Sequence, residues 1–236
     1  MNYLEFSTAF DTLVNSYDKT ALSSSIQDLK FSEYEKSVFL TEAQNDLVRD
    51  YYSGESIHRE PFEGNEYLRE SLITLIKQGN GVKAEPAIQA NAFKKSTVFK
   101  RPDDCWYIIA EQAVLGDMED KCLSGKVMDV TPVRHDDINI VIKNPFKGAS
   151  KTRVLRLDLG ESFSELISTY PISEYIIRYI MKPTPIILTP LEDLTIEGYS
   201  NIMDCKLHTS VHDTILKMAV SAAIKSRMIG VVANAS

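Results

Sequence analysis

The segment that most constrains the fold is a helix-forming stretch near the end of the chain, residues 207–223. A polar turn leads into a helix whose apolar side starts with Val211 and Ile215 and narrows to Ala219 and Ala223. Small residues on one face let a neighbouring helix approach closely. We therefore expect this segment to pack against other helices rather than to carry out chemistry.

The first 80 residues also show helical periodicity. A first helix, 4–17, has an apolar stripe made of Phe6, Phe10, Leu13 and Tyr17. A second helix starts at Ser32, which forms a capping box with Glu35. Its stripe of Leu40, Ala43, Leu47 and Tyr51 runs to a stop at Gly54. A third helix is predicted over 67–77, where Gly79-Asn80-Gly81 would end it.

The middle of the chain is rich in strand-forming residues and is punctuated by prolines. Strands are predicted at 96–100, 105–115, 126–133, 152–159, 173–182 and 184–188. The run 105–110 is apolar enough to be buried on both faces, and Pro183 and Pro185 imply an edge or a bend. A short helix over 134–143 would end at Asn144-Pro145.

These elements predict an α+β protein with an N-terminal helical bundle, a mostly antiparallel β middle, and a closing C-terminal helix that packs on the bundle. The predicted domains are 1–80 together with 207–227, a β-rich domain of 81–206, and an extended tail of 228–236. The tail is apolar and strand-forming, so it is either a frayed end or a segment that adds to a partner's surface. In the second case its binding residues would be Met228, Ile229, Val231 and Val232.

The charge of the chain is concentrated in its N-terminal third. Residues 1–80 contain 14 Asp and Glu against 7 Lys and Arg, whereas residues 81–236 contain 19 of each. A general nucleic-acid binder would instead present a basic face. The acidic residues are either solvated helix faces or a surface that repels phosphate.

Composition indicates a soluble globular protein, since 44% of the residues are hydrophobic and 25% are charged. No apolar run reaches the ~18 residues that span a bilayer, and we expect neither a membrane partner nor a signal peptide. Three widely separated cysteines, Cys105, Cys122 and Cys205, form no disulfide framework or metal motif and fit a reducing compartment.

One region could bind nucleic acid. Lys94, Lys95, Lys100 and Arg101 alternate with Phe93, Phe99 and Trp106 in residues 93–106, and basic groups with aromatic rings can grip a single strand. A β-hairpin with one polar and one buried face has the same pattern, and we favour that interpretation. Nucleic-acid binding by residues 93–106 is the alternative function.

No catalytic motif is present. His208 and His212 stand four residues apart, as two metal ligands on one helix face would, but the Glu of the zinc-protease motif and a third ligand are missing. Adjacent acidic pairs at Asp103-Asp104, Asp136-Asp137 and Glu192-Asp193 fit turns and caps better than acid–base chemistry. We therefore predict no enzyme activity, no cofactor and no metal.

Three stretches resemble the head-to-tail connector proteins of tailed bacteriophages, also called adaptor or tail ring proteins. They are the early helix over 31–44 with its Leu40-Thr41-Glu42-Ala43-Gln44, the paired segments 131–147 and 175–188, and the closing helix over 211–223. The pairing of 131–147 with 175–188 is most similar to ring proteins of crAss-like phages. The long β insertion departs from the compact adaptor and leaves the position of the ring in the stack open.

The resemblance implies a structural protein of the virion, located in the phage neck or tail and made in the host cytoplasm. Such proteins form closed homo-oligomeric rings, commonly of about twelve copies, through repeated head-to-tail contacts. The implied partners are the portal protein, adjacent tail ring proteins, and the genomic DNA that passes through the ring without sequence-specific binding. The resemblance also implies that the C-terminal segment reaches the portal.

Overall fold

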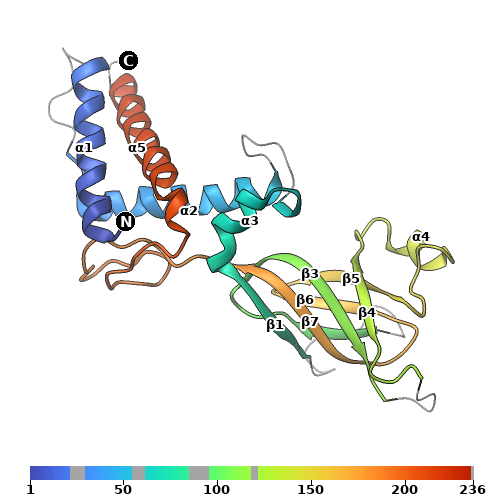
Figure 1. Cartoon of the computed structure of the whole chain (residues 1–236). Coiled ribbons are helices and arrows are strands. Elements are labelled where there is room, and N and C mark those ends of the chain that lie inside the picture. The colour runs from blue at the N-terminus through green and yellow to red at the C-terminus, as the bar shows by residue number, and fades with distance from the viewer. Residues whose placement is uncertain (22–29, 55–61, 85–95, 118–121, 235–236) are drawn as a thin grey trace. The chain divides into compact units, whose positions relative to one another are not determined.

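The structure of the chain is a computed structural model that describes residues 1–21, 30–54, 62–84, 96–117 and 122–234 (Figure 1). The chain divides into two compact units. Residues 1–75 and 183–236 form a helical unit, and residues 76–182 form a barrel unit. The predicted α+β class with a mostly antiparallel β portion is confirmed.

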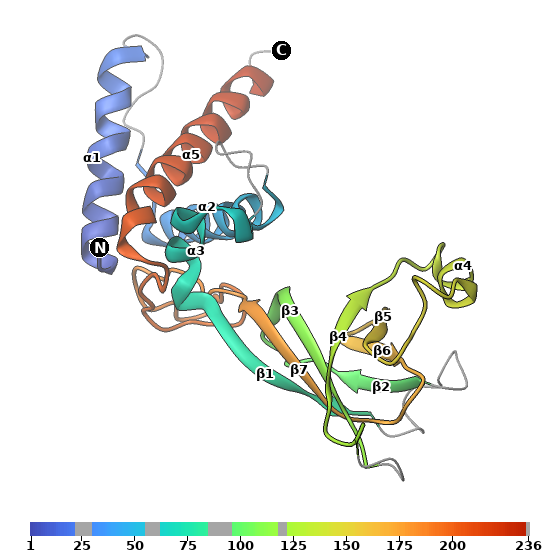
Figure 2. The same cartoon turned by 45° about the vertical axis from the view of Figure 1, so that its right-hand side comes forward.

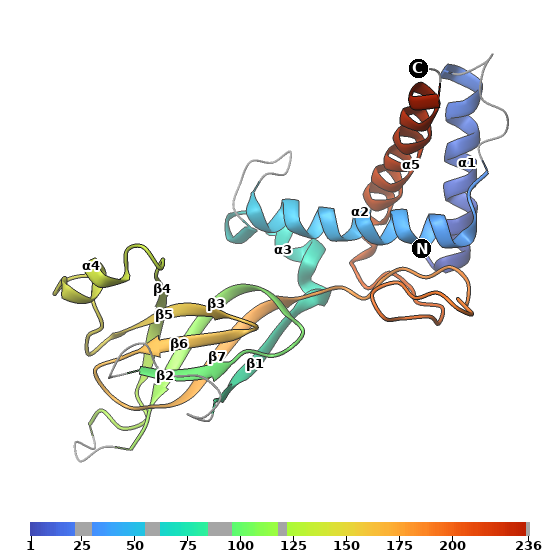
Figure 3. The same ribbon diagram turned by 180° about the vertical axis from the view of Figure 1, so that it is seen from behind.

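The helical unit joins both ends of the sequence. Its helices are α1 Tyr3–Ala21, α2 Glu33–Ser53, α3 Glu66–Leu72 and α5 His212–Asn234, with the short 3₁₀ turns η1 Phe62–Gly64, η2 Ile73–Leu75 and η3 Thr209–Val211. The closing helix α5 packs against both α1 and α2. Figures 1 and 3 show α2 crossing α1 and α5 at a steep angle, so the expected bundle of side-by-side helices is only partly formed. Among the described residues, no helix is both long enough and apolar enough to cross a membrane.

Helix α2 begins and ends as the sequence predicted. The Ser32 hydroxyl accepts from the Glu35 amide at 3.2 Å, and the Glu35 carboxylate accepts from the Ser32 amide at 2.8 Å. Gly54 closes the helix at φ 75°, a left-handed conformation that glycine adopts without steric cost.

Two predicted details of the other long helices differ from the structure. In α1 the buried residues are Phe6, Phe10 and Val14, while Leu13 is half-buried and Tyr17 is exposed. In α5 the helix continues to Asn234, through most of the segment predicted as an extended tail. That segment contains no proline, and the ~1 kcal/mol cost of Gly230 within a helix is too small to end it.

The segment that follows Pro183 forms no strand, although 184–188 was predicted as one. Polar side chains of α2 form hydrogen bonds with its backbone instead. Gln44 donates to the Thr184 carbonyl at 2.9 Å, and the Leu188 amide donates to the Ser37 hydroxyl at 3.0 Å. Prolines remove ladder donors, so side-chain hydrogen bonds replace a strand partner here. The β structure of this segment consists of two isolated bridges, Ile187 to Met203 and Ile196 to Tyr199.

The barrel unit is a closed sheet of seven strands. They are β1 Ile76–Lys83, β2 Ser96–Lys100, β3 Cys105–Leu115, β4 Val127–Pro132, β5 Arg153–Gly160, β6 Phe163–Ile167 and β7 Ile172–Met181. The order around the barrel is β1-β2-β6-β5-β4-β3-β7, and β7 pairs with β1 to close it. All pairs are antiparallel except β4 with β5, which a crossover containing α4 Ile138–Lys143 connects (Figure 2).

Strand β1 corrects the prediction of a helix over 67–77. The α-helix ends at Leu72, and Gly79 and Gly81, expected to stop a helix, lie inside the strand. A Cβ atom at Gly81 would lie 2.7 Å from Cδ1 of Tyr175, its cross-strand partner. The glycines are therefore present because tyrosine rings from β7 occupy the space where their side chains would be.

The other strands match the prediction with two exceptions. Strand β6 was not predicted, because its five residues include Ser164 and Glu165 and give no clear alternation. Residues 105–109 were expected to be buried on both faces but are half-buried, and Ala110 is exposed. The barrel core contains Phe99, Ala113, Leu115, Met128, Val154, Leu166, Ile172, Tyr175, Ile177 and Tyr179.

Candidate interaction surfaces

One aromatic residue of the predicted nucleic-acid region, Phe99, belongs to the barrel core. Phe93, Lys94 and Lys95 lie outside the described residues. Phe99 is 1% exposed, and its ring centroid lies 5.6 Å from that of Tyr175 in the core. A buried ring cannot stack on a base, so this part of the pattern is the inner face of β2, as the favoured interpretation had it.

The described cations of the same region are paired with carboxylates. Lys100 Nζ lies 2.7 Å from Oδ1 of Asp103, and Arg101 Nη1 lies 3.6 Å from Oδ1 of Asp158. These contacts compensate positive charge that phosphate would otherwise attract. The geometry of 96–106 therefore favours a strand and its turn over a nucleic-acid site.

The two histidines of the predicted metal motif make other contacts. His212 is 4% exposed, and its Nε2 atom donates to the Leu207 carbonyl at 3.0 Å. Burial lowers the pKa of His212 below its ordinary value of 6.5. His208 Nδ1 lies 2.9 Å from the Ser210 hydroxyl and caps the turn before α5. Across the described ranges, no group of three or more His, Cys, Asp or Glu side chains is arranged to hold a metal ion.

The adjacent carboxylate pairs occupy turns. Asp104 accepts from the Tyr179 hydroxyl at 2.7 Å and pairs with Lys77 at 2.9 Å, which ties the β2–β3 turn to the sheet. Asp136 pairs with exposed Arg134 at 3.5 Å in the turn before α4. Glu192 and Asp193 lie in an exposed bend. Asp103 pairs with Lys100 and Asp104 with Lys77, so these two neighbouring carboxylates have separate partners rather than a shared one.

A buried ion pair lies inside the barrel. Arg156 Nη1 is 2.8 Å from Oε1 of Glu111, and these side chains are 10% and 5% exposed. The Tyr175 hydroxyl donates to the same carboxylate at 2.5 Å. Burial raises the pKa of Glu111 even though Arg156 opposes the shift. The cluster joins β3, β5 and β7 and is enclosed by the core, so its role is structural.

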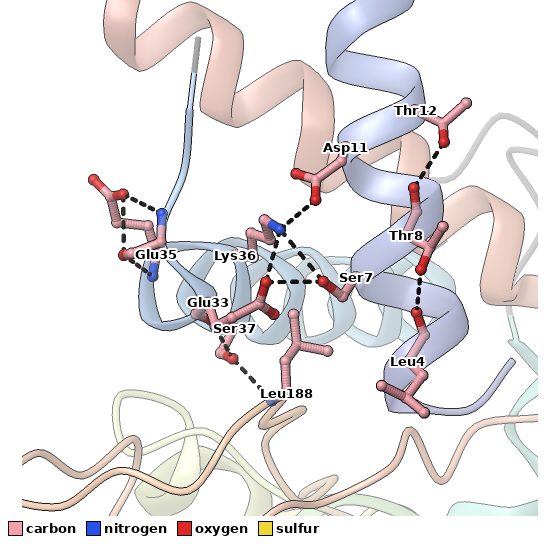
Figure 4. Close-up of polar contacts among 11 residues, drawn as sticks. Leu4, Ser7, Thr8, Asp11, Thr12, Glu33, Glu35, Lys36, Ser37 and Leu188 are labelled. Carbon is pink, nitrogen blue, oxygen red and sulfur yellow. Dashed lines mark hydrogen bonds and ion pairs between the residues drawn. The ribbon is translucent and has the colours of Figure 1, made fainter.

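An apolar groove opens between α1 and α5. It encloses about 660 Å³ and is lined by Met1, Leu4, Glu5, Thr8, Ala9, Thr12, Leu13, Asp213, Leu216 and Lys217. The Thr8 hydroxyl donates to the Leu4 carbonyl at 2.9 Å and the Thr12 hydroxyl to the Thr8 carbonyl at 2.8 Å (Figure 4). Both hydroxyls are thus engaged by the helix backbone, which leaves a mostly apolar lining.

The opposite side of α1 is polar and already has its partner. Lys36 of α2 is 3% exposed, and its Nζ atom lies 2.6 Å from Asp11, 2.8 Å from Glu33 and 3.3 Å from Ser7 (Figure 4). These contacts attach α1 to α2. The groove of α1 and α5 is therefore a separate surface that no described residue of the helical unit covers.

A second exposed apolar surface lies on the crossover between β4 and β5, residues 133–152, which we call the α4 arm. Ile138 packs against Leu155, Leu157 and Ile167 on the barrel wall. Ile140 and Phe146, in contrast, are 69% and 86% exposed. Sequence reasoning found the helix but missed this surface; the signal was the run Ile-Asn-Ile-Val-Ile, which has too many apolar residues for one buried face.

The backbone of the α4 arm is fixed although Phe146 is exposed. The Asn144 side chain accepts from the Phe146 amide at 2.9 Å, and Arg153 donates to the Phe146 carbonyl at 2.8 Å. The Gly148 amide donates to the Asn144 carbonyl at 2.8 Å, an approach so close that a Cβ at Gly148 would lie 2.8 Å from the same oxygen. The arm therefore presents Phe146 from a defined turn.

The residues predicted to bind a partner, Met228, Ile229, Val231 and Val232, lie in the last turns of α5. They form part of a helix rather than an extended segment.

Comparison with known proteins identifies relatives over almost the whole chain. Residues 1–234 match the family described as "Phage tail ring protein 3/4". The chain is 41% identical over 229 residues, 96% of both chains, to "Ring protein 3" of Bacteroides phage crAss001. It is 32% identical over 241 residues, 94% of this chain and 92% of the relative, to "Ring protein 4/5" of the same phage.

Proposed function

Because the chain belongs to the phage tail ring protein 3/4 family, we propose that it is a subunit of a closed ring in the connector that joins portal to tail. The observation that carries this proposal is the similarity to Ring protein 3 along 96% of both chains, helical unit and barrel unit included. A tail ring protein is a structural component of the virion. The proposal adds the position of the ring, its partners and its symmetry.

Two different ring proteins of one phage are related to this chain, at 41% and 32% identity. This fits a stack in which neighbouring rings are built from related subunits. We propose that this chain forms one ring of such a stack, in about twelve copies, through repeated head-to-tail contacts. Its partners would be the portal on one side and another tail ring protein on the other.

Charge supports a role in lining the DNA channel. The helical unit has 19 acidic and 10 basic side chains, a net charge of −9, whereas the barrel unit has 14 acidic and 16 basic, a net charge of +2. A negative surface repels phosphate, so DNA could slide past it without binding. We propose that the helical unit faces the channel and that DNA contacts are not sequence-specific.

The first test is the native mass of the purified chain, with electron-microscopy class averages over a range of concentrations. We expect closed rings of about twelve subunits, either from the chain alone or when portal and neighbouring tail proteins are added. A chain that stays monomeric in the presence of these partners would overturn the proposal.

We further propose that the C-terminal end of the chain, residues 228–236 with Met228, Ile229, Val231 and Val232, contacts the portal. This segment is mostly apolar, as a docking segment requires, and its residues 228–234 are the last residues of α5. Deleting residues 228–236 should remove portal binding and leave the fold unchanged by circular dichroism. Portal binding that survives the deletion would refute this assignment.

A further inference from the structure

We propose that the α4 arm of one subunit inserts into the α1–α5 groove of the neighbouring subunit, and that this contact repeats around the ring. The proposal rests on the ring assembly proposed above. It assigns the contact to particular residues: Ile140 and Phe146 on the arm, and Leu4, Thr8 and Leu13 in the groove.

The arm has the properties of an inserted element. Phe146 and Ile140 are 86% and 69% exposed and contribute little to the barrel core, yet the turn that holds Phe146 is fixed by hydrogen bonds to Asn144 and Arg153. An ordered turn that exposes a large aromatic ring loses little entropy on binding. Such residues are typical energetic centres of protein interfaces.

The groove has the properties of the matching receptor. Its volume of about 660 Å³ can receive more than one large side chain, and its walls are apolar because the Thr8 and Thr12 hydroxyls bond to the helix backbone. Leu4 on its wall is 61% exposed. Exposed apolar surface of this kind marks a site that another surface covers.

The net charges of the two units favour a second copy as the occupant. Lys143 and Lys147 flank the exposed face of the arm. The groove includes the carboxylates of Glu5 and Asp213 and the ammonium groups of Lys217 and Met1, the latter 3.8 Å from Glu5. The contrast in charge lies in the units as a whole, at +2 for the barrel unit, which carries the arm, and −9 for the helical unit, which carries the groove. A contact between the barrel unit of one subunit and the helical unit of the next therefore joins units of opposite net charge.

The two surfaces are different patches of one chain. A contact of this kind is heterologous: each subunit donates its arm to one neighbour and receives an arm from the other. Repetition of a heterologous contact generates a ring when the rotation closes. The arm and the groove thus provide the two complementary faces that a ring subunit needs.

The decisive experiment uses two full-length chains, each with one new cysteine: Leu4→Cys in one and Phe146→Cys in the other. Both carry Cys122→Ser, because Cys122 is exposed, whereas burial raises the pKa of Cys105 and Cys205 to about 11 and keeps these thiols protonated. The chains have different tags and are mixed under mild oxidation. We expect a mixed disulfide between the chains in large excess over either homodimer.

This result does not require stable rings, because oxidation also traps a weak contact. A matched pair with Asn15→Cys, an exposed α1 residue outside the groove, in place of Leu4→Cys should give at least tenfold less mixed product. Equal yields from the two pairs would overturn the proposal. That outcome would not decide whether the chain forms rings, which electron microscopy tests separately.

Substitutions test the contact in assembly. Phe146→Asp and Thr8→Arg should each raise the concentration needed for ring formation at least tenfold. The first replaces the inserted aromatic ring with a carboxylate, and the second fills the groove. The matched controls are Val127→Asp, which changes another exposed apolar residue of the barrel unit, and Asn15→Arg on α1; both should assemble as wild type.

Circular dichroism and the fluorescence of Trp106 verify that each variant is folded. Rings that form normally with Phe146→Asp and Thr8→Arg would overturn the arm–groove contact and leave the ring function in place. Loss of binding to a different tail protein, with ring formation unchanged, would assign the groove to that protein and also overturn the proposal.

Discussion

Replacing Gly81 by alanine should destabilise the barrel unit and leave the helical unit unchanged. Gly81 lies on the inner face of β1, directly opposite Tyr175 of β7. The added Cβ would be 2.7 Å from Cδ1 of Tyr175 and 3.2 Å from Cβ of Phe99. Tyr175 is completely buried, and its hydroxyl is held by Glu111 at 2.5 Å, so the ring has no free space into which to move.

The expected loss follows from two opposing terms. Overpacking a core by one methyl group costs about 1–3 kcal/mol. Removing the backbone freedom of glycine from the unfolded chain returns about 0.4–1 kcal/mol. The free energy of unfolding of the barrel should therefore fall by about 1.5 kcal/mol, which at a urea m-value of about 1.5 kcal/mol/M lowers the midpoint by about 1 M.

Urea unfolding followed by tryptophan fluorescence measures this shift, because the chain's single tryptophan, Trp106, lies in β3 of the barrel. Far-UV circular dichroism follows the helices in the same samples. The control is Gly116→Ala, whose Cβ would meet nothing closer than the Pro171 carbonyl at 3.6 Å, so its midpoint should be unchanged or raised. A fluorescence midpoint for Gly81→Ala at or above that of wild type would refute the packing argument.

Two further perturbations test the electrostatic interpretation. Arg156→Met should lower the free energy of unfolding of the barrel by about 3–5 kcal/mol, because Glu111 would remain buried without its counterion. Adding Glu111→Gln should restore most of this loss. Equal urea midpoints for the single and double variants, followed by Trp106 fluorescence, would contradict this interpretation. His212 has a pKa lowered by burial, so the unfolded chain binds the extra proton, and the stability it contributes is present above about pH 6.5 and is lost as the pH falls through the lowered pKa. The urea midpoint followed by circular dichroism should therefore fall less between about pH 7 and pH 5 in His212→Gln than in wild type, and parallel pH profiles would exclude this role.

The sequence predicted best those elements whose residues pack in the usual way. Strands β2 and β3 were predicted at their observed limits, since runs of β-branched and aromatic residues favour a pleated sheet whatever surrounds them. Helix α2 was predicted from its capping box and from Gly54, signals that depend on a few neighbouring residues. These elements follow from local interactions, so a single sequence is enough to find them.

The elements that were missed depend on distant residues. Gly79 and Gly81 resemble a helix stop until Tyr175 and Tyr179 of β7 are known to fill the space beside them. Residues 184–188 resemble a strand until α2 supplies the side chains that bind their backbone. In both cases the deciding partner lies about 100 or more residues away, beyond the reach of any periodicity argument.

The two candidate interaction surfaces were missed for a further reason. A pattern search assigns apolar residues to a core, and by that rule Ile140, Phe146 and Leu4 should be buried. The structure leaves all three exposed, at 69%, 86% and 61%, and none of them belongs to the buried cores of the described residues. In a protein whose family forms rings, residues that break the rule in this way are the first candidates for contacts between subunits. Burial inside one chain and burial between chains leave the same apolar pattern in the sequence. The exposed fraction of a side chain in the folded subunit distinguishes the two cases, so an apolar residue that the structure leaves exposed is informative.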